Sequence, residues 1–251
     1  MDKEKFECRR EELTIRGCVF RKDSEGCKPA VILSHGFLAN QETCRKYAEL
    51  LADMGYAAFT FDFCGGGLKV KSDGKSRDMT VLTEKEDLIS VISFVKGLPY
   101  VDADRVSLLG GSQGGYVSAM AAAEHPELVD RLILFYPALC IPDDARSGKM
   151  MFYKFDPDNI PDILGKHPMP LGGQYARCVI DANPFEQIKG FTGPVLILHG
   201  TADRIVKPDY SRKAAEGYPG CRLEIIEGGG HGFSGRYDSR ACDILRNFMK
   251  I

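Results

Sequence analysis

The feature that most constrains this chain is the run Gly-Gly-Ser-Gln-Gly-Gly at residues 110–115. An aliphatic run at 105–109 precedes it and predicts a buried strand, while an Ala-rich run at 116–124 follows it and has good helix propensity. A Gly-x-Ser-x-Gly turn between a strand and a helix is the setting of a nucleophile elbow, the sharp turn that exposes a reactive serine. The pattern therefore predicts that Ser112 is a nucleophile.

So sharp a turn requires small residues beside the serine. Gly110 and Gly114 avoid a collision between the strand and the helix, so Ser112 can adopt a strained conformation with its hydroxyl exposed. The helix that begins at Gln113 would direct the positive end of its dipole at an anion forming on a substrate. A glycine-rich loop without chemistry is the alternative, because five-residue patterns arise by chance. The flanking strand and helix favour the elbow.

The rest of the chain alternates between the two kinds of secondary structure. Strands are expected over residues 12–20, 30–34, 56–63, 131–136, 194–200 and 222–226, and helices over 43–54, 81–96 and 237–249. The first strand is expected at the sheet edge in a leading hairpin, and residues 21–29 are expected to form a polar turn. The alternation predicts an α/β fold with a mostly parallel central sheet and helices on both faces.

One segment interrupts the alternation. Residues 137–190 lie between two expected core strands and are rich in Pro, Gly, Asp and Met. Because a structureless loop of that length would be unusual, we expect a lid with short helices or a hairpin of its own, set over the elbow side of the sheet. Residues 1–136 and 191–251 would then form the α/β core. An insertion without a function is the alternative.

Composition excludes several classes of function. The chain has 251 residues and a net charge of −2, which suits one globular α/β domain and gives no basic surface for nucleic acid. No apolar run approaches the ~20 residues of a membrane span, and the charged start does not resemble a signal peptide. Nine scattered cysteines without a Cys-x-x-Cys pair predict a reducing cytoplasm. We expect no cofactor, metal, nucleic-acid or membrane partner, and the sequence leaves a homodimer open.

An exposed serine needs a base within hydrogen-bond reach and a carboxylate that fixes the tautomer of that base. On a fold of this kind the partners follow in the order serine, acid, histidine. His231 is the predicted base because it lies in a Gly-rich stretch after the last expected strand. His199 closes a buried strand, where a bond to the backbone is the expected role, and His167 lies in the insertion.

The acid and the oxyanion donors are predicted from their positions after expected strands. Asp203 is the predicted acid because it follows the strand expected over 194–200. Asp209 is the alternative, although its position suits the N-terminal charge of the next helix. Two backbone amides should stabilise the oxyanion, that of Gln113 after the nucleophile and that of Phe37 in His35-Gly36-Phe37.

With these motifs in place, the chain resembles the α/β-hydrolase superfamily, and more closely the bacterial cinnamoyl (feruloyl) esterases. The resemblance runs nearly end to end. It includes His35-Gly36-Phe37, Met79-Thr80-Val81-Leu82, the elbow, residues 158–161, Leu171-Gly172-Gly173 and the loops of Asp203 and His231. It implies a cytoplasmic or gut-associated serine esterase with a small lid.

The resemblance also implies substrate-binding residues. In that family an acidic residue and a tyrosine of the lid bind the phenolic hydroxyl of a hydroxycinnamoyl group, and the matching positions are Asp144 and Tyr175, with Asp143 as an alternative to Asp144. The chain departs from the family at Gly111, where these esterases often carry histidine, and at residues 64–67, which replace a loop that usually includes one. These changes concern the wall of the pocket.

The expected function is hydrolysis of small aromatic, feruloyl-type or short acyl carboxylic esters through a covalent acyl-serine. The same residues could instead cleave a lysophospholipid, a thioester or a peptide bond. The insertion carries Arg146, Lys149, Lys154 and Asp156, and this mixed character favours a small substrate with a polar tip. A non-catalytic binding module is disfavoured because all three triad positions are filled.

Overall fold

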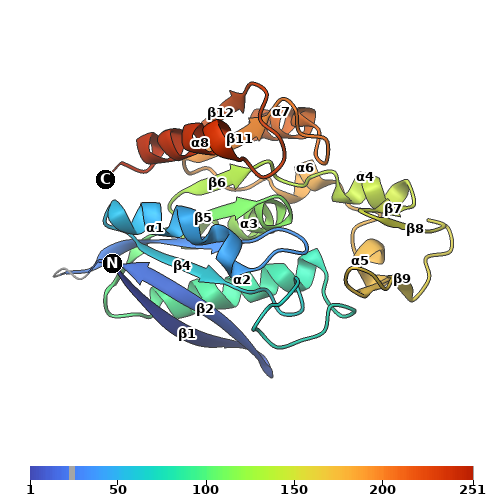
Figure 1. The fold of residues 1–251 in the computed structure, drawn as a ribbon, viewed down its shortest axis with the longest axis horizontal. Helices are drawn as coiled ribbons and strands as arrows, with labels where there is room; N and C mark the ends of the chain where they lie inside the picture. The colour runs from blue at the N-terminus through green and yellow to red at the C-terminus, as the bar shows by residue number, and fades with distance from the viewer. Residues whose placement is uncertain (23–25, 251) are drawn as a thin grey trace.

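An eight-stranded sheet forms the centre of the computed structural model, which describes residues 1–22 and 26–250, and helices cover both of its faces (Figure 1). The strand order is β1-β2-β4-β3-β5-β6-β11-β12. The strands are β1 (Asp2–Arg10), β2 (Leu13–Arg21), β3 (Lys28–Ser34), β4 (Ala57–Phe61), β5 (Val101–Gly111), β6 (Leu132–Phe135), β11 (Val195–Gly200) and β12 (Cys221–Ile226). The principal helices are α1 (Arg45–Asp53), α2 (Val81–Lys96), α3 (Gln113–Glu124), α7 (Pro208–Glu216) and α8 (Gly235–Phe248).

From β4 to β12 all neighbouring strands are parallel, while β1, β2 and β4 pair antiparallel. The predicted α/β fold with a mostly parallel sheet is therefore confirmed. The turn expected over residues 21–29 includes residues 23–25, which lie outside the described residues. In the described part of the chain, no helix is long and apolar enough to cross a bilayer.

The expectation that the strand over residues 12–20 forms the sheet edge is wrong. That strand is β2, which pairs with β1 on one side and with β4 on the other, so β1 is the edge strand. Strand β1 was not predicted from the sequence because most of its residues are charged. Only Phe6 and Cys8 of its nine residues are buried. Phe6 lies opposite Gly17, where an added Cβ would approach its ring to 2.5 Å.

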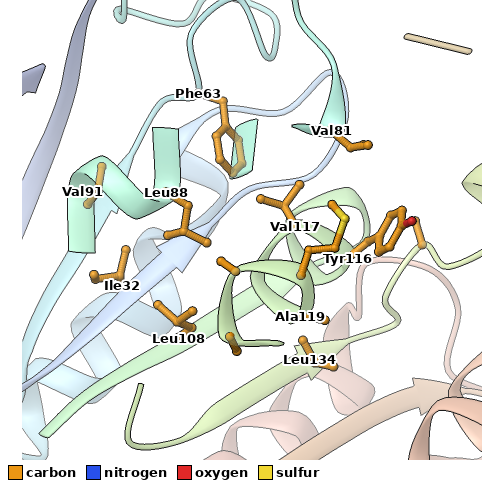
Figure 2. Close-up of a cluster of buried hydrophobic side chains, with 14 of the residues drawn as sticks. Ile32, Phe63, Val81, Leu88, Val91, Leu108, Tyr116, Val117, Ala119 and Leu134 are labelled. Atoms are coloured by element: carbon orange, nitrogen blue, oxygen red, sulfur yellow. The ribbon is translucent and has the colours of Figure 1, made fainter. Parts of the chain in front are cut away.

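Successive residues of the central strands enter two different cores. On β3, Ala30 and Ile32 belong to the core under α2 and α3, whereas Val31 and Leu33 belong to the core under α1 and α8. Figure 2 shows the first of these cores, in which side chains of the sheet meet side chains of α2 and α3. All seven residues of β3 are buried, as a parallel strand covered on both faces requires.

The boundaries of α2 match the expected helix over residues 81–96. Thr80 caps its N-terminus: the Thr80 hydroxyl accepts from the Thr83 amide, and the Thr83 hydroxyl accepts from the Thr80 amide. This reciprocal pair satisfies two amides that the first turn leaves free. It fixes where α2 begins, directly beside the elbow helix α3, with which α2 packs.

Residues 137–190 leave the main sheet after β6 and return to it at β11. They contain α4 (Ile141–Arg146), β7 (Lys149–Met150), β8 (Tyr153–Lys154), β9 (Ile163–Gly165), β10 (Leu171–Gly172), α5 (Gln174–Arg177) and α6 (Pro184–Gln187). Strands β7 and β8 pair with each other, as do β9 and β10, and neither pair joins the main sheet. The segment extends from one end of the sheet (Figure 1), and we call it the insertion.

Candidate active site

Ser112 stands at the turn between β5 and α3 in a backbone conformation that few residues other than glycine adopt. Its φ is +54° and its ψ is −121°, which typically costs about 1–3 kcal/mol. Neighbouring strands hold the turn: the Ser112 amide donates to the Phe135 carbonyl at 2.9 Å, and the Ser112 carbonyl accepts from the Ala138 amide at 2.9 Å. The strain predicted from the sequence is present.

The glycines of the elbow allow the close approach of strand and helix. A Cβ at Gly110 would lie 2.2 Å from the Gly114 carbonyl oxygen, and a Cβ at Gly114 would lie 2.4 Å from the carbonyl oxygens of Ser34 and His35. Because these neighbours are backbone atoms, they cannot turn away. The two positions therefore require glycine.

We predict that Gly110→Ala lowers the free energy of unfolding by about 1–3 kcal/mol, because the added methyl group forces the strand and helix apart. Gly97→Ala is the matched control, since Gly97 ends α2 at φ −82° and its added Cβ would have no neighbour closer than 3.5 Å. Urea unfolding monitored by circular dichroism measures both. Equal effects of the two changes would contradict the steric account.

Three side chains from three loops meet at the carboxyl ends of the strands. His231 Nε2 lies 2.9 Å from Ser112 Oγ, and His231 Nδ1 lies 2.8 Å from Asp203 Oδ2. The loops that carry them follow β5, β11 and β12. Since the carboxylate can only accept, Nδ1 carries the proton and Nε2 is left to accept from the serine hydroxyl. The structure thus brings together all three residues predicted for the triad.

Asp203 is buried yet remains ionised. Its Oδ1 accepts from the amides of Ile205 and Val206 at 2.8 and 2.9 Å, and its Oδ2 lies 3.2 Å from His199 Nε2. Burial raises the pKa of Asp203, but the hydrogen bonds with His199, His231 and Val206 outweigh burial and hold that pKa well below its ordinary value. A carboxylate fixed in this way can orient and stabilise a protonated imidazole.

The other candidates are placed elsewhere. Asp209 is an exposed residue of α7 paired with Arg212 at 2.8 Å. His167 is exposed in the insertion. His199 is fully buried, where Nε2 donates to the Val206 carbonyl at 2.9 Å and Nδ1 accepts from Ser211 Oγ at 2.7 Å. The bond to the backbone expected for His199 is therefore present.

Sequence reasoning missed Tyr136, which packs against the base. The centres of the Tyr136 and His231 rings are 4.5 Å apart, and Phe233 contacts Tyr136 with ring centres 5.1 Å apart. A Cβ at Gly111 would lie 3.6 Å from the Tyr136 hydroxyl, so the tyrosine borders the residue before Ser112. The only signal in the sequence was its place as the last residue of the strand expected over 131–136.

The two amides predicted for the oxyanion hole border the serine. Phe37, Gln113 and Ser112 line one cavity, and a Cβ at Gly36 would lie 3.2 Å from Ser112 Cβ. Neither the Phe37 amide nor the Gln113 amide donates to another group among residues 1–22 and 26–250, so both can receive an oxyanion. We therefore retain Phe37 and Gln113 as the candidate donors.

His35 anchors the loop that carries Phe37. Its Nδ1 donates to the Gly36 carbonyl at 2.9 Å, and its Nε2 accepts from the Phe63 amide at 3.1 Å. Burial lowers the pKa of His35, which favours the neutral ring that this pair of bonds requires. The side chain thereby fixes the loop against the segment that follows β4.

Two cavities meet at Ser112. The first, about 240 Å³, lies under the insertion and is lined mainly by apolar side chains, including Phe37, Ile141, Met150 and Leu171. The second, about 440 Å³, borders His231 and has a more polar rim. On that rim Asp238 accepts from the Tyr47 hydroxyl at 2.5 Å and forms an ion pair with Lys46.

Of the insertion residues predicted to bind substrate, Asp144 and Tyr175 line the first cavity with Ser112. Burial raises the pKa of Asp144. Asp143 instead faces outward, where it accepts from the Tyr210 hydroxyl and from Arg146, each at 2.6 Å. Of the two neighbouring acids, only Asp144 borders the cavity.

The fold and this arrangement of side chains define an α/β hydrolase. Residues 26–172 match the family described as serine aminopeptidase, S33, and this chain belongs to that family.

Similar proteins of known structure carry the same fold. The structure of Est1E from Butyrivibrio proteoclasticus with bound ferulic acid is 29% identical to this chain and superposes with a TM-score of 0.90, covering 97% of each chain. The mouse mitochondrial palmitoyl-protein thioesterase ABHD10 is 26% identical over 82% of this chain and 69% of its own length. The mouse ABHD10 structure superposes with a TM-score of 0.75 at 19% identity over 98% of each chain, which shows a shared fold.

Proposed function

We propose that this protein is a serine carboxylesterase that hydrolyses small aromatic esters of the hydroxycinnamoyl or feruloyl type, or short acyl esters. The observation that carries the proposal is the contact of His231 with both Ser112 and Asp203, at 2.9 and 2.8 Å. The likeness to Est1E with bound ferulic acid supports an aromatic acyl group. The small first cavity supports an acyl group of limited size.

The geometry supports a two-step mechanism. His231 Nε2 takes the proton from Ser112 Oγ as that oxygen bonds to the ester carbonyl carbon, and the carbonyl oxygen becomes an oxyanion held by the amides of Phe37 and Gln113. The imidazolium then gives its proton to the leaving alkoxide as the carbon–oxygen bond breaks, which leaves an acyl-serine. Water, deprotonated by His231, attacks the acyl-serine, and the proton returns to Ser112 as the acid leaves.

The two cavities suggest separate places for the two parts of the ester. The first cavity, with its apolar lining and with Asp144 and Tyr175 at its wall, would hold the acyl group. The second borders His231, which protonates the leaving oxygen, so it would hold the alcohol. Under this proposal the insertion acts as a lid that encloses the acyl side of the site.

A thioester is the second candidate, favoured by the likeness to the palmitoyl-protein thioesterase ABHD10. The same nucleophile would attack a thioester carbonyl. The first cavity, at about 240 Å³, is smaller than the roughly 300–1,000 Å³ of typical small-molecule sites. The first cavity therefore suits a thioester with a short acyl group better than one with a long acyl chain.

We predict that Ser112→Ala abolishes hydrolysis of p-nitrophenyl acetate while the protein stays folded, because the nucleophile is lost and the strained turn is retained. Release of p-nitrophenol, with circular dichroism as the control for folding, measures this. Unchanged turnover would contradict the assignment of the nucleophile.

We predict that Asp203→Asn lowers kcat by as much as about 10⁴-fold, because the amide no longer holds the reactive tautomer of His231. Asp209→Asn is the matched control and should leave kcat unchanged, since Asp209 is exposed on α7. Steady-state kinetics with p-nitrophenyl acetate compare the two variants. A loss in the Asp209 variant alone would show that the acid is wrongly assigned.

We predict that Tyr175→Phe reduces kcat/KM more for methyl ferulate than for phenyl acetate. The Tyr175 hydroxyl donates to Gln113 Oε1, so its oxygen keeps lone pairs that can accept from a phenolic hydroxyl of the acyl group. Parallel measurements with both esters separate this loss from any general one. Equal losses would reject a phenol-binding role for Tyr175.

A further inference from the structure

A buried carboxyl group that the proposed mechanism does not use lies beneath the elbow. Glu84, in the first turn of α2, is fully buried. Its Oε2 accepts from Gln113 Nε2 at 2.7 Å, and its Oε1 has no hydrogen-bond partner among the described residues. Gly66 provides the room for this carboxyl group, because a Cβ there would lie 2.6 Å from Oε1.

The Gln113 side chain connects Glu84 to the insertion. While its Nε2 donates to Glu84, its Oε1 accepts from the hydroxyl of Tyr175 on α5. Gln113 and Tyr175 are both buried, with exposed fractions of 1% and 4%. A continuous chain of hydrogen bonds therefore joins α2, the first residue of α3 and α5.

The chain ends beside both candidate oxyanion donors. Gln113 carries one of the two amides, and the Tyr175 ring packs on the ring of Phe37, which carries the other, with centres 5.8 Å apart. One residue of the insertion thus contacts the side chains of both residues that carry the candidate donors. The Tyr175 hydroxyl is hydrogen-bonded to Gln113, the residue that directly follows the strained Ser112.

The surroundings of Glu84 favour a neutral carboxyl group. Burial raises its pKa well above the ordinary 4.5, the negative charge of Asp87 raises it further, and the bond from Gln113 opposes this only in part. The ionisable groups that face it are Asp87, which is paired with Arg10 at 2.5 Å, and Tyr175. A neutral acid can accept from Gln113 without leaving a charge buried.

We propose that Glu84 is a positioning residue of the active site, which through Gln113 and Tyr175 holds the first turn of α3 and the oxyanion hole in place relative to the insertion. The proposal rests on the proposed function of Ser112 and its oxyanion donors. An apolar residue at 84 could fill the same space, but it would leave the buried Gln113 amide group without its acceptor. The polar chain fixes one orientation of Gln113, which packing alone would not specify.

The test compares three variants of the full chain. Glu84→Met keeps the length of the side chain but removes the acceptor, so kcat for p-nitrophenyl acetate should fall about 10- to 100-fold with little change in KM, as expected for misplaced catalytic groups. Glu84→Gln keeps an acceptor and should restore kcat to within a few-fold of the original. Glu86→Met, on the exposed face of the same helix, is the matched control and should have no effect.

A double-mutant cycle separates positioning from a general loss of packing. If Glu84, Gln113 and Tyr175 act as one chain, Glu84→Met combined with Tyr175→Phe should lower kcat little more than the worse single variant does. Independent losses that multiply would overturn the proposal. So would a folded Glu84→Met variant with the original kcat.

A stability measurement tests the protonation state of Glu84. Because the pKa of Glu84 is higher in the folded state than in the unfolded state, its stabilising contribution is present below pH 4.5 and is lost as the pH rises. Glu84→Gln cannot lose a proton, so its Tm relative to the original protein should rise between about pH 4 and about pH 8. A constant difference in Tm would contradict the neutral carboxyl group alone. If Glu84→Met does not fold, Tyr175→Phe breaks the same chain of hydrogen bonds and should lower kcat for p-nitrophenyl acetate, and an unchanged kcat would overturn the proposal.

The reactivity of Ser112 distinguishes a failure of the proposed function from a failure of the Glu84 proposal. If the original protein hydrolyses no ester, the rate at which a fluorophosphonate modifies Ser112 replaces kcat for every variant, since that reaction needs the activated serine and the oxyanion hole but no particular ester. A reactive Ser112 with equal rates in the original protein and Glu84→Met would reject the role of Glu84 alone. An unreactive Ser112 in the original protein would reject the proposed function itself.

Discussion

The hydrogen bond between His231 and the buried Asp203 carboxylate is the interaction on which the site depends. Two backbone amides and His199 compensate the charge of Asp203 and fix its orientation. His231 has no such support of its own, because it stands in a glycine-rich loop. Among the described residues, its side chain forms hydrogen bonds only with Asp203 and Ser112 and packs on the ring of Tyr136. The orientation of the base is therefore inherited from a carboxylate held by the loop after β11.

The sheet explains why residues so far apart in the chain meet. Strands β5, β6, β11 and β12 are parallel neighbours, so their carboxyl ends lie along one edge. Ser112, Asp203 and His231 follow β5, β11 and β12, and the insertion begins after β6, between them. The insertion thereby reaches Ser112 at that edge of the sheet, and Tyr175 joins it to the elbow.

The sequence predicted those parts of the structure that depend on a local pattern, and the chain order serine, acid, histidine predicted the meeting of Ser112, Asp203 and His231. Other long-range contacts could not be predicted. The spacing of apolar residues predicted the first and last residues of α2, and the glycines around Ser112 predicted the elbow. Strand β1 was missed because its charged side chains face solvent along most of its length. The chemical setting of Glu84 and of Tyr136 depends on residues distant in sequence, and the choice between Asp143 and Asp144 depends on Tyr210, which lies on α7.

The most direct test of the central claim is the labelling of Ser112 by a fluorophosphonate, followed by mass spectrometry, in the original protein and in His231→Ala. If Asp203 and His231 activate the serine, the probe should modify Ser112 alone in the original protein, and the rate should fall by orders of magnitude in the variant. Equal labelling rates in the two proteins, or modification at a different residue, would contradict the account.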